Sequence, residues 1–136
     1  MLKGTYAFKS ILNSGAKIVF GSDWTVAPMS PILGIYAAVT RETIDGSQPG
    51  GWHPNEKMTV DEALLAYTAS VAYAGFQEDV LGTIEVGKLA DFVVLSHDLF
   101  KIEPEEIKNT GVLRTVVGGK TRFFSADSGG KKPIWY

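Results

Sequence analysis

The sequence predicts an α/β fold with two structural pieces. A continuously apolar, β-favouring run, Ile18–Phe20, follows a short helical pattern and a glycine turn, an order that is half of a β–α–β unit. Helical patterns dominate residues 1–75, whereas residues 89–124 are mostly strand-like. The 136 residues suit one domain and fall well short of the roughly 250 residues of a complete (β/α)8 barrel.

The first expected elements are a helix and a buried strand. Residues 5–14 have apolar side chains on one helical face, and the turn residues Asn13–Gly15 end the helix. Residues 16–23 follow as a strand. Its core, Ile18–Phe20, shows no polar alternation, which is typical of a strand buried on both faces of a parallel sheet.

Two further helices are expected before residue 75. Ser30–Pro31 provides an N-cap and a proline at the first helical position, and the helix runs to about Arg41. The capping-box pattern of Thr59–Glu62 begins the other helix, which continues to about Ala74. A long loop rich in Gly and Pro, residues 44–57, separates them and has the length of a binding loop. The expected inward positions are Ile32, Ile35, Tyr36, Val39, Ala63, Leu64, Tyr67 and Val71.

The second piece is predicted to be mainly β. A strand is expected at 91–96 and a short helical turn at 103–107. Strand-like runs at 112–117 and 120–124 flank Gly118–Gly119, which is typical of a β-hairpin. The expected organisation is therefore residues 1–75, residues 76–124 and a tail, residues 125–136.

The composition excludes several classes of protein. An apolar share of 45% with a net charge of −2 indicates a globular chain. The absence of cysteine excludes disulfides and cysteine-bound zinc, and two histidines exclude a site that takes three from this chain. The chain lacks a basic stripe and an apolar run of membrane-spanning length, so we expect a cytoplasmic protein with no nucleic-acid or membrane partner.

Asp23 is the first candidate for chemistry, because it directly follows the predicted strand. In parallel α/β folds the ligand site lies at the carboxyl ends of the strands. A carboxylate at that place can bind a divalent metal or act as a general base toward water. Alternatively, the Asp23 side chain caps the turn that follows. Its position alone leaves both interpretations open.

Several motifs, taken together, resemble the amidohydrolase superfamily. Gly21–Trp24 followed by Ala37–Arg41 is similar to the end of its barrel. Gly82–Leu95 resembles the return into its small β-domain, and Thr115–Lys120 resembles its final hairpin. The likeness is strongest to amidohydrolase family 3, the branch of YtcJ-like and N-substituted formamide deformylase-like enzymes, and it covers about residues 3–124.

The resemblance implies the C-terminal fragment of a (β/α)8 metal-dependent hydrolase barrel, plus part of its small β-domain, a composite β-sandwich. It implies hydrolysis of a C–N bond in an amide or cyclic amide through water activated by a divalent metal, with zinc as the expected ion. Asp23 takes the place of the aspartate that binds or adjoins the metal and passes a proton from the water to the leaving amine. The histidine ligands of the superfamily have no match here, so we expect the isolated chain to bind metal weakly and to be inactive.

Three further residues are candidates for substrate binding. The resemblance places Arg41 in a segment over the active site, although a solvated or ion-paired arginine is the simpler interpretation. Trp24 either walls the substrate pocket or is a core aromatic residue. His53 either lines the pocket or is an exposed loop histidine. His97 and Asp91 are expected to be structural, with Asp91 fixing the turn just before it in the chain.

The alternative function is a non-catalytic, self-associating domain or remnant of such an enzyme. A piece of a barrel exposes apolar faces, such as that of Ile18–Phe20, and exposed strand edges favour pairing. We therefore expect a homo-oligomer or association with the missing barrel portion. A small amide-type substrate is the expected partner of the whole enzyme.

Overall fold

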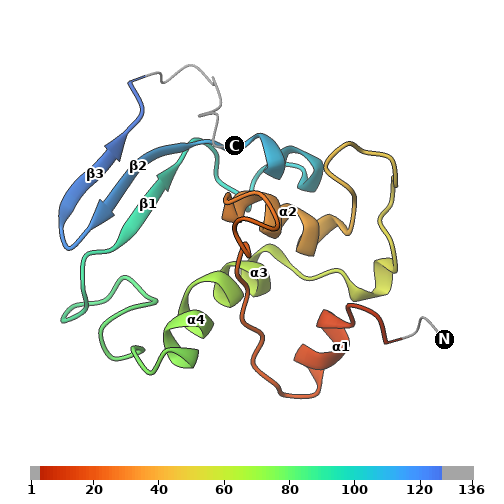
Figure 1. The fold of residues 1–136 in the computed structure, drawn as a ribbon, viewed down its shortest axis with the longest axis horizontal. Coiled ribbons are helices and arrows are strands. Elements are labelled where there is room, and N and C mark those ends of the chain that lie inside the picture. The colour runs from red at the N-terminus through yellow and green to blue at the C-terminus, as the bar shows by residue number, and fades with distance from the viewer. Residues whose placement is uncertain (1–3, 127–136) are drawn as a thin grey trace.

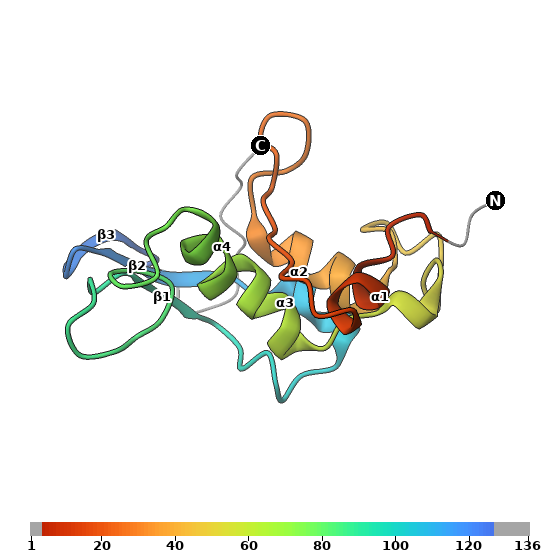
Figure 2. The ribbon, with the colours of Figure 1, turned by 90° about the horizontal axis from the view of Figure 1, so that it is seen from below.

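The computed structural model describes residues 4–126, with the helices gathered at one end and a small antiparallel sheet at the other (Figures 1 and 2). The expected tail lies outside the described residues from position 127 onward. The helices are α1 (Phe8–Asn13), α2 (Pro31–Thr40), α3 (Val60–Tyr67) and α4 (Ala69–Ala74), with 3-10 turns η1 (Pro54–Glu56) and η2 (Pro104–Asn109). The sheet has the order β1 (Phe92–Leu95), β2 (Val112–Val117), β3 (Lys120–Phe124). In the part of the chain that is described, no helix has the length and apolar character needed to cross a membrane.

The hydrophobic core is built around α2. Its four predicted inward residues are buried, and Tyr36 is completely enclosed. Met58 and Ala63 pack against them from one side, while Leu99 and Ile107 reach the same core from the segment that follows β1. Pro31 occupies the start of the helix as predicted, although the hydroxyl of Ser30 makes no capping hydrogen bond.

The capping box predicted for the next helix is confirmed. The Thr59 hydroxyl accepts a hydrogen bond from the Glu62 amide at 3.2 Å, and the Thr59 amide donates to the Glu62 carboxylate at 2.8 Å. The continuous helix predicted from there to Ala74 is wrong, because the backbone breaks at Thr68 and separates α3 from α4. The Thr68 hydroxyl donates to the Leu64 carbonyl at 2.7 Å, and this kind of back-bonding bends helices.

The strand predicted for residues 16–23 is absent from the described structure, where this segment is irregular. Val19 is 44% exposed, so burial on both faces is also wrong. A strand needs a neighbour for its backbone hydrogen bonds, and the described part of the chain places none beside this segment. A hydrogen bond from the Phe20 amide to the Ala66 carbonyl, 3.0 Å long, ties the segment to α3.

The C-terminal hairpin is confirmed. β2 and β3 are antiparallel, and Gly118 and Gly119 form their turn with φ values of 58° and 73°. Two successive positive φ angles are the geometry that favours glycine in a two-residue hairpin. Asp91 is structural, but it fixes a different turn from the one expected: its carboxylate accepts a 2.6 Å hydrogen bond from the Gly118 amide.

Candidate functional site

Asp23 lies on the loop that joins α1 to α2, and this loop projects away from the helices (Figure 2). Its backbone carbonyl accepts hydrogen bonds from the amides of Val26 at 2.7 Å and Ala27 at 3.3 Å, so main-chain bonds hold the turn. The Asp23 carboxylate is exposed and has no hydrogen-bond or ion-pair partner among residues 4–126. Trp24 beside it is 52% exposed. Both oxygens of Asp23 are therefore available for a proton or a ligand.

A pocket of about 340 Å³ opens between α1, α2, α3 and the loop that follows α2. Five aromatic side chains from separate parts of the chain line it: Tyr6, Phe8, Phe20, Trp52 and Tyr67. They meet mostly edge to face, with ring centroids 5.3 Å apart for Phe8 and Phe20 and 6.0 Å apart for Tyr6 and Trp52. The pocket therefore has rigid, largely apolar walls.

Arg41 supplies the positive charge of this pocket. It is the C-cap of α2, and its guanidinium donates from Nε to the Trp52 carbonyl at 3.0 Å and from Nη1 to the Tyr6 carbonyl at 3.1 Å. The guanidinium carbon also lies 5.6 Å from the centroid of the Phe8 ring. Nη2 is buried and has no hydrogen-bond partner within the described residues. Arg41 thus joins three segments and keeps one donor nitrogen uncommitted.

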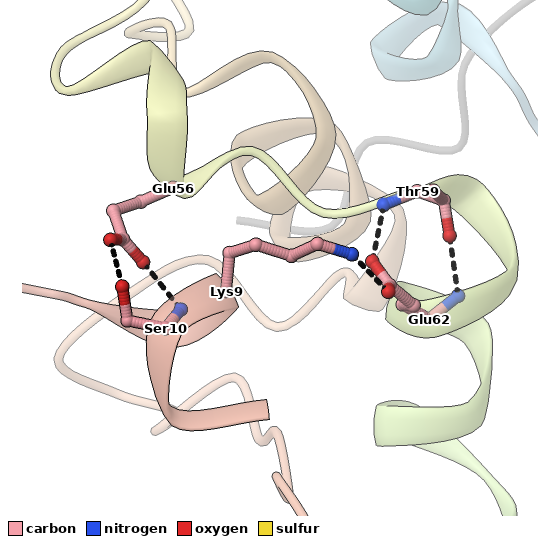
Figure 3. A network of polar contacts seen from close by, with 5 residues as sticks. All are labelled: Lys9, Ser10, Glu56, Thr59 and Glu62. Carbon is pink, nitrogen blue, oxygen red and sulfur yellow. Dashed lines mark hydrogen bonds and ion pairs between the residues drawn. The ribbon is translucent and has the colours of Figure 1, made fainter. Parts of the chain in front are cut away.

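Two carboxylates lie near Arg41. Glu42 lines the pocket, and its oxygens accept hydrogen bonds from the Tyr36 hydroxyl at 3.1 Å and from the Gly50 amide at 2.8 Å. Glu56 is hydrogen-bonded by Ser10 (Figure 3). The Ser10 hydroxyl chiefly, with a smaller contribution from the charge of Arg41, holds the pKa of Glu56 below its usual value.

The same side of the molecule contains the polar network that fixes α1. Lys9 of α1 pairs with Glu62, which also closes the capping box with Thr59 (Figure 3). The hydrogen bond from Lys9 is the main reason why the pKa of Glu62 is lowered. Phe8, which is the neighbour of Lys9 in α1, is thereby held in place as a wall of the pocket.

Tyr67 reaches the pocket because position 34 on α2 is a glycine. A Cβ atom at Gly34 would lie 1.8 Å from the Tyr67 hydroxyl oxygen. Burial raises the pKa of Tyr67, so its phenol stays protonated near neutral pH. The ring therefore adds a neutral, flat surface opposite α2.

The histidines lie outside the residues that line the pocket. His53 begins η1 and packs edge-on against Trp52, with ring centroids 4.2 Å apart. His97 follows β1, and its Nδ1 is 2.9 Å from the Ser96 hydroxyl. Arg41 thus lines the pocket, and His53 packs against Trp52, which is one of its walls. Asp23 and Trp24 lie on the loop between α1 and α2 and are not among the lining residues.

The described residues do not fit a metal site by themselves. Within residues 4–126 no three side chains of the His, Cys, Asp or Glu type come together in a way that could hold an ion. Structural and catalytic zinc sites take at least three protein ligands. Asp23 can therefore contribute at most one ligand to a site that other polypeptide would have to complete.

Sequence reasoning missed most of the pocket. The sequence predicts Phe20 in a buried strand and Tyr67 in a helix core, and it indicates no site role for Tyr6, Phe8 or Glu42. The sequence offers only a weak signal: Trp52 follows Arg41 at a short distance along the chain, whereas Tyr6 and Phe8, just before and at the start of α1, are far from it in sequence. That signal does not show that the segments converge.

Comparisons with known proteins find one family model and several relatives that match most of the chain. The model of the "Amidohydrolase family" matches residues 1–123. "Protein LONG AFTER FAR-RED 3" of Arabidopsis thaliana is 40% identical over 119 residues, which are 88% of this chain and 20% of that protein. "Putative amidohydrolase YtcJ" of Bacillus subtilis is 33% identical over 88% of this chain and 22% of its own length. "N-substituted formamide deformylase" of Arthrobacter pascens is 35% identical over 87% of this chain and 21% of its own length.

A solved structure supports the same fold. The amidohydrolase from Thermotoga maritima MSB8 superposes with a TM-score of 0.66 at 23% identity. The match covers 88% of this chain and 26% of that one. The chain thus spans about a fifth of the length of the curated relatives and about a quarter of the solved structure.

Proposed function

The chain belongs to the amidohydrolase family, and from that membership we propose that it is the C-terminal part of a hydrolase that cleaves C–N bonds. The match to the family model over residues 1–123 supports this proposal. Because the relatives are about five times as long, the activity belongs to the longer protein and this chain contributes only part of the site. The cytoplasmic location expected from the sequence stays a prediction.

The proposed architecture assigns the two ends of the structure to two parts of the enzyme. Residues 1–75 are the last barrel strand and its flanking helices, and residues 76–124 are a segment of the small β-domain that ends in the hairpin. The order of α1, an irregular segment and α2 supports the first assignment, since a barrel strand lies between two helices. The three-stranded antiparallel sheet supports the second. Under this proposal residues 16–23 become a strand only when barrel neighbours pair with them.

The free carboxylate of Asp23 is the observation that carries the proposed chemistry. An exposed, unpartnered carboxylate can accept a proton from an attacking water and deliver it to the leaving nitrogen. The amide C–N bond breaks, the carbonyl carbon gains the water oxygen, and a carboxylic acid and an amine form. The Asp23 side chain is exposed, so it is open to a substrate.

A divalent metal, with zinc as the expected ion, remains a proposal for the longer protein. The family is generally metal-dependent, but the described residues hold no complete metal site. The ligands other than Asp23 must therefore come from polypeptide outside these residues. The proposed proton transfer at Asp23 requires only its carboxylate.

The proposed substrates are small amides or cyclic amides. One relative is named for N-substituted formamides, and shorter matches of 38% and 43% identity over 63 residues are to imidazolonepropionases. We propose that Trp24, next to Asp23, contacts the substrate. We also propose that Arg41 and His53, which lie after α2 and not on the Asp23 loop, contact the substrate.

A hybrid enzyme tests this function. Residues 5–124 replace the corresponding segment of the Arthrobacter pascens deformylase, and hydrolysis of an N-substituted formamide is measured. We expect the hybrid to turn over the formamide and the Asp23→Asn hybrid to lose at least about a hundredfold in kcat, the range of a lost acid–base group. Asp61→Asn is the matched control, because Asp61 is an exposed carboxylate in the first turn of α3.

Full activity in a folded Asp23→Asn hybrid would refute the assignment of Asp23. Equal losses in both Asp→Asn variants would show that the effect is not specific to the site. Circular dichroism of each hybrid establishes that it is folded before the rates are compared.

The second candidate function is that of a non-catalytic, self-associating domain. Several large apolar side chains are almost wholly exposed, among them Val26 at 84%, Phe76 at 92% and Ile84 at 83%. Apolar surface of this kind favours an interface. A second copy of the chain, or the remainder of the barrel, is the proposed occupant.

A further inference from the structure

We propose that Asp45 is a site of isomerisation to isoaspartate, and that the turn around it slows this reaction while the chain is folded. Asp45 is the only Asp or Asn residue of the sequence that is directly followed by glycine. It lies in the loop that follows α2, and its side chain is exposed. The proposal goes beyond the hydrolase function and does not depend on it, because it concerns the main chain of this loop.

The reaction takes place between the carboxyl group of Asp45 and the backbone nitrogen of Gly46. The nitrogen bonds to Cγ of Asp45, and the amide proton leaves with the carboxyl OH as water. Glycine favours this step because it has no Cβ atom to obstruct the approach. Water then adds to one of the two carbonyl groups of the imide ring. Addition at Cγ restores aspartate, whereas addition at the main-chain carbonyl leaves the chain linked through Cγ, which is isoaspartate, with no net gain or loss of atoms.

The turn engages the nitrogen that would attack. The Gly46 amide donates a hydrogen bond of 2.9 Å to the Thr43 carbonyl. The proton has to leave this nitrogen as the ring closes, so the hydrogen bond must break first. Lys108 of η2 fixes the turn to the body of the fold, since its Nζ donates to the Ile44 carbonyl at 3.3 Å. The folded chain therefore lowers the fraction of time in which Gly46 can react.

The turn also keeps the carboxyl group of Asp45 in its ionised form. Its Oδ1 accepts a hydrogen bond from the Ser47 amide at 3.0 Å, and the same amide donates to the Thr43 hydroxyl at 3.1 Å. The Thr43 hydroxyl chiefly, and then the amide and hydroxyl of Ser47, hold the pKa of Asp45 at about 2, below its ordinary value of 3.8. An ionised carboxylate has no OH to lose as water. Ring closure near neutral pH therefore depends on the small protonated fraction.

Isomerisation changes the loop covalently. Isoaspartate adds one carbon atom to the main chain and shortens the side chain, so the hydrogen bonds of residues 43–47 cannot form as they do now. The same loop carries Trp52, a wall of the pocket beside Arg41, and Gly50, whose amide binds the Glu42 carboxylate. A change at Asp45 is therefore expected to reach the residues around the pocket.

The rate of isoaspartate formation in the folded 136-residue chain tests the proposal. The chain and a synthetic peptide of residues 40–50 are kept at pH 7 and the same temperature, and isoaspartate at position 45 is measured by peptide mapping with mass spectrometry. The peptide does not hold the turn, because it lacks the contacts that offset the entropy of ordering it. We expect formation at least about tenfold slower in the chain, since lowering the pKa from 3.8 to about 2 reduces the protonated fraction by more than about tenfold.

Thr43→Val is the variant that weakens the turn. It removes the hydroxyl that accepts from Ser47 and retains the branched shape of the side chain. We expect isoaspartate to form about two- to tenfold faster than in the unaltered chain, the factor of one ordinary hydrogen bond. Thr25→Val is the matched control, because Thr25 is an exposed threonine between α1 and α2, and it should leave the rate unchanged.

Each outcome of these measurements bears on the proposal. Absence of isoaspartate from the peptide would overturn the assignment of Asp45 as a site, and equal rates in the peptide and the folded chain would overturn the protection by the turn. An unchanged rate in Thr43→Val, shown to be folded by circular dichroism, would overturn the role given to the Thr43 hydroxyl. If this variant does not fold, the comparison of the unaltered chain with the peptide still decides the matter.

Discussion

The contacts of Arg41 depend on a single glycine. Gly51 has a φ of 81°, and a Cβ atom built on it would lie 2.2 Å from the Thr40 carbonyl oxygen and 2.9 Å from the Arg41 Cβ. This close approach lets the Trp52 amide donate to the Arg41 carbonyl at 2.8 Å. Gly50 has a nearly identical φ of 82° and open space around it. Substituting alanine at each of these two glycines therefore separates the free-energy cost of the backbone angle from that of the close contact.

We predict that Gly51→Ala is clearly more destabilising than Gly50→Ala. Both substitutions force alanine into a left-handed conformation, at a cost of about 1–2 kcal/mol. Gly51→Ala adds a clash with backbone atoms, which cannot move as freely as a side chain, and costs about 1–3 kcal/mol more. Urea unfolding of both variants measures the difference. Equal free energies of unfolding would show that the loop relaxes around the added methyl group.

At this scale the sequence can nominate residues for chemistry, but it cannot nominate the side chains that surround them. Asp23 and Arg41 could be selected from their motifs, because those motifs are local in the chain. The walls of the pocket could not, since Phe8, Phe20 and Tyr67 meet only through tertiary packing. The contact of Tyr67 with α2 depends on the absence of a side chain at Gly34, and no local rule assigns that role to a helical glycine.

At the scale of elements, α1 is held in position by polar contacts as well as by partial burial of two apolar side chains. Its six residues include none that is fully buried, and an isolated helix of this length is unstable in water. Lys9 and Ser10 bind Glu62 and Glu56, which lie at the start of α3 and in η1 (Figure 3). These two links add to the packing of the partly buried Phe8 and Leu12 against the core.

We predict that Lys9→Met lowers the free energy of unfolding at pH 7 by about 0.5–1 kcal/mol. Lys9 holds the pKa of Glu62 below its ordinary value of 4.5, so the ionised carboxylate is more stable in the folded state. The stabilisation is therefore complete above pH 4.5 and is lost as the pH falls through the lower folded value. Lys9→Met should flatten this part of the pH profile, which urea unfolding between pH 7 and pH 3 measures.

Lys101→Met is the control for this profile. Lys101 pairs with Asp98 at 2.9 Å, but its side chain is 80% exposed, and exposed pairs contribute little to stability. It should leave stability at pH 7 nearly unchanged. A loss as large as that of Lys9→Met would mean that removal of any lysine charge, rather than the link to α1, accounts for the effect.

The elements that could be predicted are those with local signals. The capping box of Thr59 and Glu62 and the Gly118–Gly119 turn each work within a few residues, and both are present. The strand at residues 16–23 and the unbroken helix to Ala74 failed for different reasons. The strand needs hydrogen-bonding neighbours that the described residues do not supply, and the helix is interrupted by the back-bonding of Thr68.

At the scale of the whole molecule, two properties bear on the proposed larger assembly. Apolar side chains are exposed in several loops, including Val26 before α2 and Phe76 after α4. The family relatives are about five times longer than this chain. We propose that added polypeptide covers these side chains, pairs with residues 16–23 and brings further ligands to Asp23. Light scattering of the purified chain shows whether a second copy already covers them.

We propose that polypeptide beyond these 136 residues completes the catalytic site. Measuring the metal content and the amide hydrolysis of the isolated chain tests this proposal most directly. The chain is purified in the presence of zinc, dialysed, and assayed for bound metal and for hydrolysis of small amides. We expect less than stoichiometric zinc and no turnover, because no three metal-binding side chains converge among residues 4–126. Stoichiometric, tightly bound zinc together with hydrolysis that Asp23→Asn abolishes would contradict it.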